Sequence, residues 1–336
     1  MTEPTPTEPA QTEPTPLTFA VAQYPHTRQL TQGPVTTRSG LTLAPVTVKP
    51  IIAAFRRMIR DLEFDVCEVA VTTYLVAREA GIPIIALPVF LNRKFHHGDV
   101  MCRPGSGITG PKDLEGRKVG VRAYSVTTGA WVRGILHEQF GVDLDSITWL
   151  VDDEEHVESL QLPGNVQHVG AGTSVAQLFN EGGIDAALSG RAGIGRTGAP
   201  TEGWDRAPAT SAEAYPLFEK AAQLQRDWFA QTGCYPIHGV LTVKAATVAR
   251  HPELVADLWQ LFTDAKADLL RRIEDPADTD ADVVRYRAQR DIVGPDPLPF
   301  GLEANRPSIE AIIRFSHDQG LLAGRPEPEA VFVAVD

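Results

Sequence analysis

The chain of 336 residues is 43% hydrophobic and 22% charged, as is typical of a soluble globular protein, and it is long enough for two lobes with separate cores. Its formal net charge of −12 argues against nucleic acid or an anionic membrane as a partner. A small anion is still an acceptable ligand, because a local group of arginines can override the overall sign.

The N-terminal segment, residues 1–16, repeats the triplet Thr-Glu-Pro and has neither a basic start nor an apolar core. This composition predicts a disordered, polyproline-like tail and not a signal peptide. No apolar run approaches the length of a membrane span. We therefore expect a cytoplasmic protein that does not contact a membrane.

Strands alternate with helices in the next part of the chain, which indicates an α/β unit with a largely parallel sheet. One predicted helix has apolar residues at helical spacing, and the last predicted strand is apolar throughout, as a fully buried strand would be. The predicted strands are 17–22, 64–70 and 82–90, and the predicted helices are 48–62 and 73–80.

A second unit of this kind starts near residue 107. Its predicted strands are 117–121, 146–151 and 184–189, its predicted helices are 129–140, 175–180 and 218–232, and a Gly-, Pro- and Thr-rich loop covers 193–212. A strand at 235–244 then returns toward the first unit, and a helix at 251–273 follows. We predict one lobe from 17–104 and 235–336 and another from 105–234, with a ligand cleft between them at the carboxyl ends of the strands.

The loop Gly294–Pro307 contains four prolines and two glycines, which keep it stiff and irregular, and it leads into a predicted helix at 308–317. It carries Asp296, Glu303 and Asn305. Polar groups on a stiff loop beside a helix N-terminus suit an anionic ligand, so Glu303 and Asn305 are candidates for substrate binding. A rigid surface connection is the alternative interpretation.

Residues 107–121 resemble the opening of one lobe in type II periplasmic-binding-protein folds. Five segments together resemble the 4,5-dihydroxyphthalate decarboxylase family, which uses this fold as an enzyme. They are residues 24–28, 64–75, 88–97 and 124–136, and residues 233–238 taken with the loop and helix that end at His317. The chain departs from the usual family pattern at His96-His97-Gly98, where Arg-His-Ser is more frequent, and at Cys67 and Leu298.

The resemblance implies the loss of one carboxylate from 4,5-dihydroxyphthalate to give protocatechuate. A phenol para to the leaving carboxylate pushes electrons into the ring, the ring carbon takes a proton, and carbon dioxide leaves. Such a site needs cations for two carboxylates, a base near the phenol, and a proton donor over the ring carbon.

Arginine binds a carboxylate through two parallel hydrogen bonds. Arg93 follows an apolar strand, so we expect it at the cleft as a substrate ligand, with Arg28 and Arg133 as similar candidates. Arg191 follows another predicted strand and could lie there too. A solvated surface charge is the alternative for each of them.

His97 and His238 are the candidates for proton transfer, because histidine titrates near neutral pH. His97 lies in a loop after a strand, whereas His238 lies in an apolar strand and could be an ordinary core histidine. Glu68 and Asp296 could act as a base or orient a histidine, or they could cap a helix or fix a loop.

Ser125, Thr127 and Thr128 precede a predicted helix, and their hydroxyls together with the free N–H groups of its first turn suit an anion. The same residues would also explain an ordinary helix cap. Thr72 and Thr73 are expected to have the same role in the first lobe.

A divalent metal is left open, because His96, His97 and Asp99 are close in sequence, although their spacing matches no strong metal motif. The three distant cysteines predict neither a zinc site nor a disulfide framework. No glycine-rich loop of the Walker or Rossmann type occurs, so we expect no cofactor.

The favoured hypothesis is a decarboxylase that acts on an aromatic carboxylate. The alternative is a solute-binding or sensor protein for an aromatic carboxylate or a similar anion, since one fold can serve both roles. The absence of an export signal in this sequence favours the enzyme. The pattern leaves a homo-oligomer open.

Overall fold

The computed structural model describes residues 15–195 and 213–335. The predicted tail and the predicted loop at 193–212 therefore lie almost entirely outside the described residues. Elsewhere, each predicted helix and strand occurs within a few residues of its expected bounds. The helices are α1 (Ile51–Asp61), α2 (Val71–Glu79), α3 (Thr127–Phe140), α4 (Val175–Glu181), α5 (Ala221–Thr232), α6 (Ala245–Arg250), α7 (Leu254–Glu274), α8 (Ala281–Val293), α9 (Arg306–Asp318) and α10 (Pro328–Val331).

The first sheet has the strand order β2-β3-β1-β4-β12-β5. Strand β1 runs parallel to both β3 and β4, whereas β12 pairs antiparallel with both β4 and β5. These strands are β1 (Leu17–Ala20), β2 (Val35–Thr36), β3 (Thr42–Pro45), β4 (Val66–Ala70), β5 (Ile84–Arg93) and β12 (Ile237–Lys244).

The second sheet has the order β11-β6-β10-β7-β8-β9. Strands β10, β7, β8 and β9 are mutually parallel, and β6 is antiparallel to β10 and β11. The boundary predicted at residue 104 would put β6 in the first lobe, but it pairs in this sheet. These strands are β6 (Val100–Cys102), β7 (Lys118–Val121), β8 (Thr148–Val151), β9 (Val166–His168), β10 (Ala186–Leu188) and β11 (Tyr215–Pro216).

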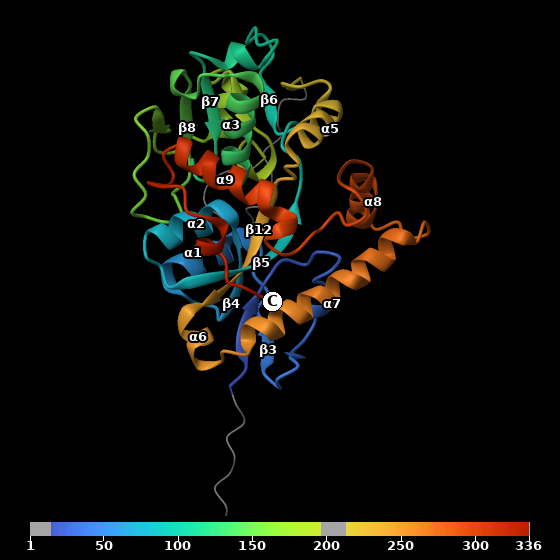
Figure 1. The fold of residues 1–336 in the computed structure, drawn as a ribbon. Coiled ribbons are helices and arrows are strands. Elements are labelled where there is room, and N and C mark those ends of the chain that lie inside the picture. The colour runs from blue at the N-terminus through green and yellow to red at the C-terminus, as the bar shows by residue number, and fades with distance from the viewer. Residues whose placement is uncertain (1–14, 196–212, 336) are drawn as a thin grey trace, which may run out of the picture.

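The two sheets, each flanked by helices, form the two lobes that the sequence predicts (Figure 1). Both sheets are mixed but mostly parallel in strand direction, because β2 and β12 in the first sheet, and β6 in the second, run against the other strands. The chain returns from the second lobe through β12, which enters the first sheet from the side of the other lobe. It therefore runs against β4, whose carboxyl end points toward that lobe.

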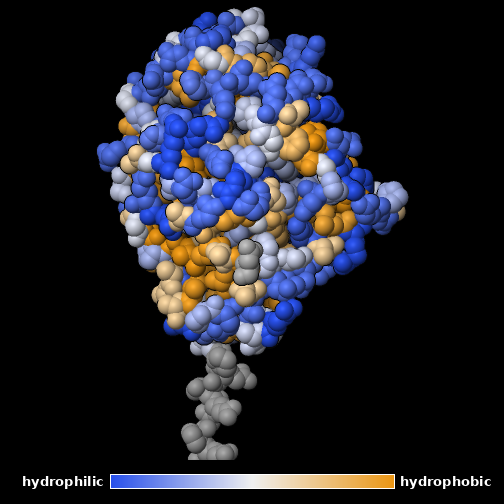
Figure 2. Space-filling model, viewed as in Figure 1, coloured by the Kyte–Doolittle hydropathy of each residue, from blue (hydrophilic) through white to orange (hydrophobic). Residues whose placement is uncertain are grey.

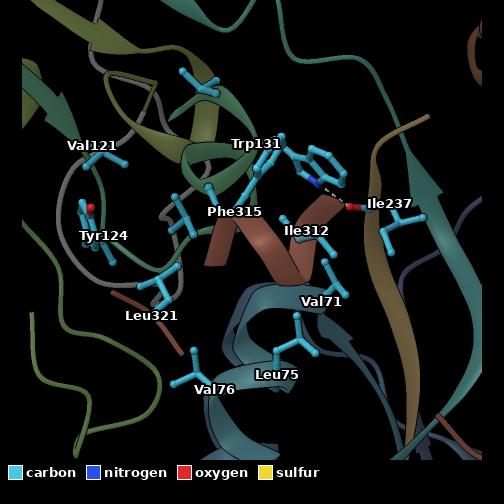
Figure 3. Packing of buried hydrophobic residues seen from close by; sticks show 14 of the residues in the cluster. Val71, Leu75, Val76, Val121, Tyr124, Trp131, Ile237, Ile312, Phe315 and Leu321 are labelled. Atoms are coloured by element: carbon cyan, nitrogen blue, oxygen red, sulfur yellow. Dashed lines mark hydrogen bonds between the residues drawn. The ribbon is translucent and has the colours of Figure 1, made fainter. Parts of the chain in front are cut away.

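A continuous apolar core joins the lobes. Helix α9 packs between α3 of the second lobe and α2 of the first, and Phe315 meets Trp131 edge to face at 5.7 Å (Figure 3). A Cβ on Gly134 would overlap the Phe315 ring, so glycine permits this close packing. The indole N–H of Trp131 donates to the carbonyl oxygen of Ile237 at 2.8 Å, which ties α3 to β12.

The face shown in Figure 2 is largely hydrophilic, and its broadest apolar patch lies on the first lobe. No helix among the described residues combines the length and apolar character that crossing a membrane requires.

Candidate functional site

A cleft of about 310 Å³ lies between the lobes. The carboxyl ends of β4 and β5 and the amino end of β12 reach it from the first sheet, and the residues after β7, β8 and β10 reach it from the second. The first turns of α1 add an apolar wall of Ile51, Ile52 and Phe55. The predicted location of the site at the strand ends agrees with this cavity.

Glu68 on β4 is a buried titratable group in the cleft wall. Its side chain is buried, one carboxyl oxygen accepts a hydrogen bond from the Tyr24 hydroxyl at 2.7 Å, and the other accepts one from the Ala22 N–H at 3.0 Å. Burial raises the pKa of Glu68 to about 7, although both hydrogen bonds oppose the rise. A Cβ on Gly239 of β12 would overlap the carboxyl group, so glycine leaves the space that Glu68 occupies.

Two histidines line the cleft in their neutral form. His238 on β12 lies 3.5 Å from the Thr128 hydroxyl, and burial together with the nearby charges of His96 and Lys94 lowers its pKa to about 3. His156 follows β8 and faces Phe55, with ring centroids 6.4 Å apart. Burial, and then the charges of nearby arginines, lowers the pKa of His156 well below its usual value.

Cationic side chains line the cleft from both lobes. Lys94 follows β5 and binds the Asp99 carboxylate at 2.8 Å. Arg122 follows β7 and pairs with Asp153 at 3.2 Å, and Arg191 follows β10. The cleft of this acidic protein thus contains three cationic side chains, of which Lys94 and Arg122 each pair with an aspartate.

The N-terminus of α3 also opens on the cleft, with Ser125, Thr127 and Thr128 in its lining. No side chain among the described residues caps this helix, so the N–H groups of its first turn are available to a ligand. Glu155 instead fixes the preceding turn, because its carboxylate accepts from the Tyr124 N–H at 2.6 Å and from the Ser125 N–H at 3.1 Å.

Six of the predicted site residues thus lie together in the cleft lining: Glu68, Thr73, Ser125, Thr127, Thr128 and His238. Thr72 lies directly behind them, and its hydroxyl is 2.7 Å from that of Thr127. The roles assigned to these residues remain predictions.

Arg93 does not lie at the cleft, contrary to expectation. Its guanidinium is fully buried behind β5, where it donates to the Asn305 side chain, to the carbonyl oxygen of Tyr235 and to the Ser308 hydroxyl. Side chains alternate along a strand, and its neighbours Asn92 and Lys94 are the ones that line the cleft. Arg93 therefore fixes the loop before α9.

The other two predicted arginines are also outside the cleft lining. Arg133 is buried in α3, donates to Gln319 at 2.7 Å and to the Tyr124 carbonyl oxygen at 2.6 Å, and stacks on the Tyr124 ring. Arg28 pairs with Asp280 at 3.0 Å, and 46% of its side chain is exposed.

His97 and the polar residues of the loop Gly294–Pro307 are likewise elsewhere. His97 bonds Gln139 at 2.9 Å among aromatic rings, outside the cleft lining. Asp296 accepts from Lys266 at 2.8 Å, and Glu303 pairs with Arg306 on the surface. Asn305 binds the carbonyl oxygens of its own loop, so this stretch is the rigid connection that was the alternative interpretation.

His96 and Asp99, two of the residues considered for a metal, bond each other at 2.7 Å. Burial would raise the pKa of Asp99, but His96 and Lys94 outweigh that effect and lower it to about 2. Within residues 15–195 and 213–335, no group of three or more His, Cys, Asp or Glu side chains is arranged to hold a metal ion.

Sequence reasoning did not select Lys94, Arg122, Glu155 or His156. A usable signal existed for Arg122, because it directly follows the predicted strand at 117–121, much as Arg191 comes shortly after its own strand. Glu155 and His156 lie in an irregular segment after β8, where no pattern in the sequence distinguishes them.

Comparison with known proteins supports the resemblance. A family model described as NMT1/THI5 like matches residues 58–274. A protein of Comamonas testosteroni named 4,5-dihydroxyphthalate decarboxylase is 30% identical in an alignment of 332 positions that covers 94% of this chain and 96% of that protein. The chain belongs to the 4,5-dihydroxyphthalate decarboxylase family. A protein of the same name from Pseudomonas putida is 30% identical over 190 residues, covering 52% of this chain and 70% of that protein.

Solved structures confirm the fold. The periplasmic aliphatic sulphonate binding protein SsuA of Escherichia coli superposes with a TM-score of 0.52 at 12% identity, over 95% of this chain and 98% of its own. The desulfurization enzyme DSZB superposes with a TM-score of 0.51 at 15% identity, over 94% and 96%. A binding protein and an enzyme therefore share this two-lobed architecture, and at such identities the likeness concerns the fold alone.

Proposed function

We propose that this protein removes one carboxylate, as carbon dioxide, from a hydroxylated aromatic dicarboxylate, with 4,5-dihydroxyphthalate as the substrate and protocatechuate as the product. The name of the two relatives supports this reaction. The cleft supports it through the combination of cations, an apolar wall and a carboxyl group that is protonated near neutral pH.

The observation that carries the proposal is the presence of a buried carboxyl group with a raised pKa, Glu68, in the cleft wall. A general acid works best when its pKa is close to the working pH, and burial raises the pKa of Glu68 to about 7. Its carboxyl O–H would give a proton to the ring carbon that bears the leaving carboxylate. The bond between the ring carbon and the carboxylate carbon then breaks. Its electron pair restores the aromatic ring, and carbon dioxide departs. Water returns the proton to Glu68.

The remaining groups of the cleft suit the binding of such a substrate. Lys94, Arg122 and Arg191 could neutralise two carboxylates, with the N-terminus of α3 as a further donor. The apolar wall from α1 suits the aromatic ring. Because His238 and His156 are neutral at pH 7, either can accept a hydrogen bond from a phenol hydroxyl.

The experiment is to incubate chelator-treated protein with 4,5-dihydroxyphthalate and follow protocatechuate and carbon dioxide. We expect turnover without added metal. The Glu68→Gln variant cannot donate the proton. It should bind phthalate but form no protocatechuate from 4,5-dihydroxyphthalate. Full turnover by that variant would exclude Glu68 as the acid. If the chelator-treated natural protein becomes active only after a divalent ion is added, the reaction requires a metal.

The second candidate function is the binding of an aromatic carboxylate or a related anion without reaction, as in a solute-binding or sensor protein. The observation in its favour is the fold shared with a sulphonate-binding protein. Saturable binding of 4,5-dihydroxyphthalate with no product under either metal condition would support this candidate over the enzyme.

A further inference from the structure

Asp153 joins the two lobes beside the cleft. Its side chain is only 1% exposed, and each of its carboxyl oxygens binds a different arginine. Arg122, which lines the cleft from the second lobe, donates to one oxygen at 3.2 Å. Arg56, on α1 of the first lobe, donates to the other at 3.0 Å. A buried carboxylate is stable only with such partners, so the three side chains form one unit.

The main chain strengthens this unit. The backbone N–H groups of Asp152 and Asp153 both donate to the carbonyl oxygen of Arg122, at 3.1 and 2.9 Å. From the other lobe, Arg60 of α1 donates to the carbonyl oxygens of Glu155 at 2.9 Å and His156 at 3.3 Å. The first lobe thus contacts the segment 153–156, which carries both the Asp153 carboxylate and the cleft residues Glu155 and His156.

We propose that Asp153 is the positioning residue of Arg122, and that Arg56 of the opposite lobe controls this positioning by binding the other oxygen of the same carboxylate. A guanidinium on a long side chain needs a fixed partner to present one orientation to a ligand. The main chain keeps Asp153 beside Arg122, and contact of α1 with residues 153–156 fixes the orientation of its carboxylate. Anion binding in the cleft and contact between the lobes are then coupled, with Arg122 and Arg56 at the two ends of the coupling.

The inference rests on the proposed function only in assigning Arg122 to a ligand carboxylate. Its test uses phthalate, which has both carboxylates but no hydroxyl groups, and measures affinity by calorimetry without turnover. Arg56→Gln should weaken phthalate binding about tenfold in the otherwise natural protein, within the range usual for coupled sites. In the Arg122→Gln background the same substitution should have almost no effect, since the group that it acts through is gone.

Matched variants separate positioning from general damage. Arg56→Lys keeps the charge and should restore part of the affinity. Arg57→Gln is the control, because Arg57 is the next residue of α1 but pairs with Glu63 on the surface. Asp153→Asn should reproduce the effect of Arg56→Gln. Thermal unfolding of each variant shows whether it is folded.

The inference is overturned if Arg56→Gln has no effect, or if it weakens phthalate binding equally with and without Arg122. Failure of the natural protein to bind phthalate would overturn it as well, because Arg122 would then hold no aromatic carboxylate. Coupling without any turnover of 4,5-dihydroxyphthalate would instead reject the decarboxylase function and leave the role of Asp153 intact.

Discussion

The raised pKa of Glu68 makes a measurable prediction about stability. A carboxyl whose pKa is about 4.5 in the unfolded chain and about 7 in the folded protein favours folding most below pH 4.5. This contribution is lost as the pH rises, because the unfolded chain gives up the proton first. A difference of about 2.5 pKa units corresponds to about 3 kcal/mol of unfolding free energy lost between pH 4.5 and pH 8. The Glu68→Gln variant has no proton to lose and should not show this decrease.

Urea unfolding of both proteins at several pH values from 4.5 to 8 measures the effect. Other groups titrate in this range, but they are shared, so the difference between the two curves isolates Glu68. The variant should be less stable at pH 4.5, where its amide cannot accept both hydrogen bonds that Glu68 accepts, and it should gain about 3 kcal/mol relative to the natural protein by pH 8. Glu63→Gln, on the surface, is the control. Parallel curves would refute the assignment of a raised pKa to Glu68.

Two further substitutions test the description of the site. Gly239→Ala places a methyl group on the Glu68 carboxyl, so we expect turnover to fall about a hundredfold while phthalate still binds. Gly164→Ala, where a Cβ meets no described atom within 4 Å, is its control, and normal activity of the first variant would contradict the close contact. Arg93→Gln removes buried hydrogen bonds and should cost about 3 kcal/mol in urea unfolding, with phthalate affinity unchanged. If the variant lost phthalate affinity but kept its unfolding free energy, Arg93 would be a ligand-binding residue after all.

The sequence predicted the long elements well, because each has enough residues to display its period. Apolar positions at helical spacing placed α1 within a few residues, and the continuous apolar run placed β5. Strands of two or three residues, such as β2, β6 and β11, are too short to show any alternation. They exist because neighbouring strands offer unpaired edges, which is a property of the assembled sheet.

The candidate site was predicted less completely, and the end of β5 shows why. The sequence places Asn92, Arg93 and Lys94 at the end of a buried strand, but which of them faces the cleft depends on the phase of the strand within the sheet. Asn92 and Lys94 face it, and Arg93 faces the opposite side. Shifting the phase by one residue would have exchanged them.

By itself, the sequence determined the two-lobed α/β architecture, the family, and the part of the cleft lining that Glu68, His238 and the first turn of α3 contribute. Those conclusions depend on local periodicity and on short sequence segments, each of which can be compared with the family pattern separately. The tertiary structure decided which charges meet. Arg122 and Arg56 share Asp153, and Gly239 makes room for Glu68, only because distant segments are brought together in space. Burial, which raises the pKa of Glu68, arises from the same packing and has no counterpart in the linear chain.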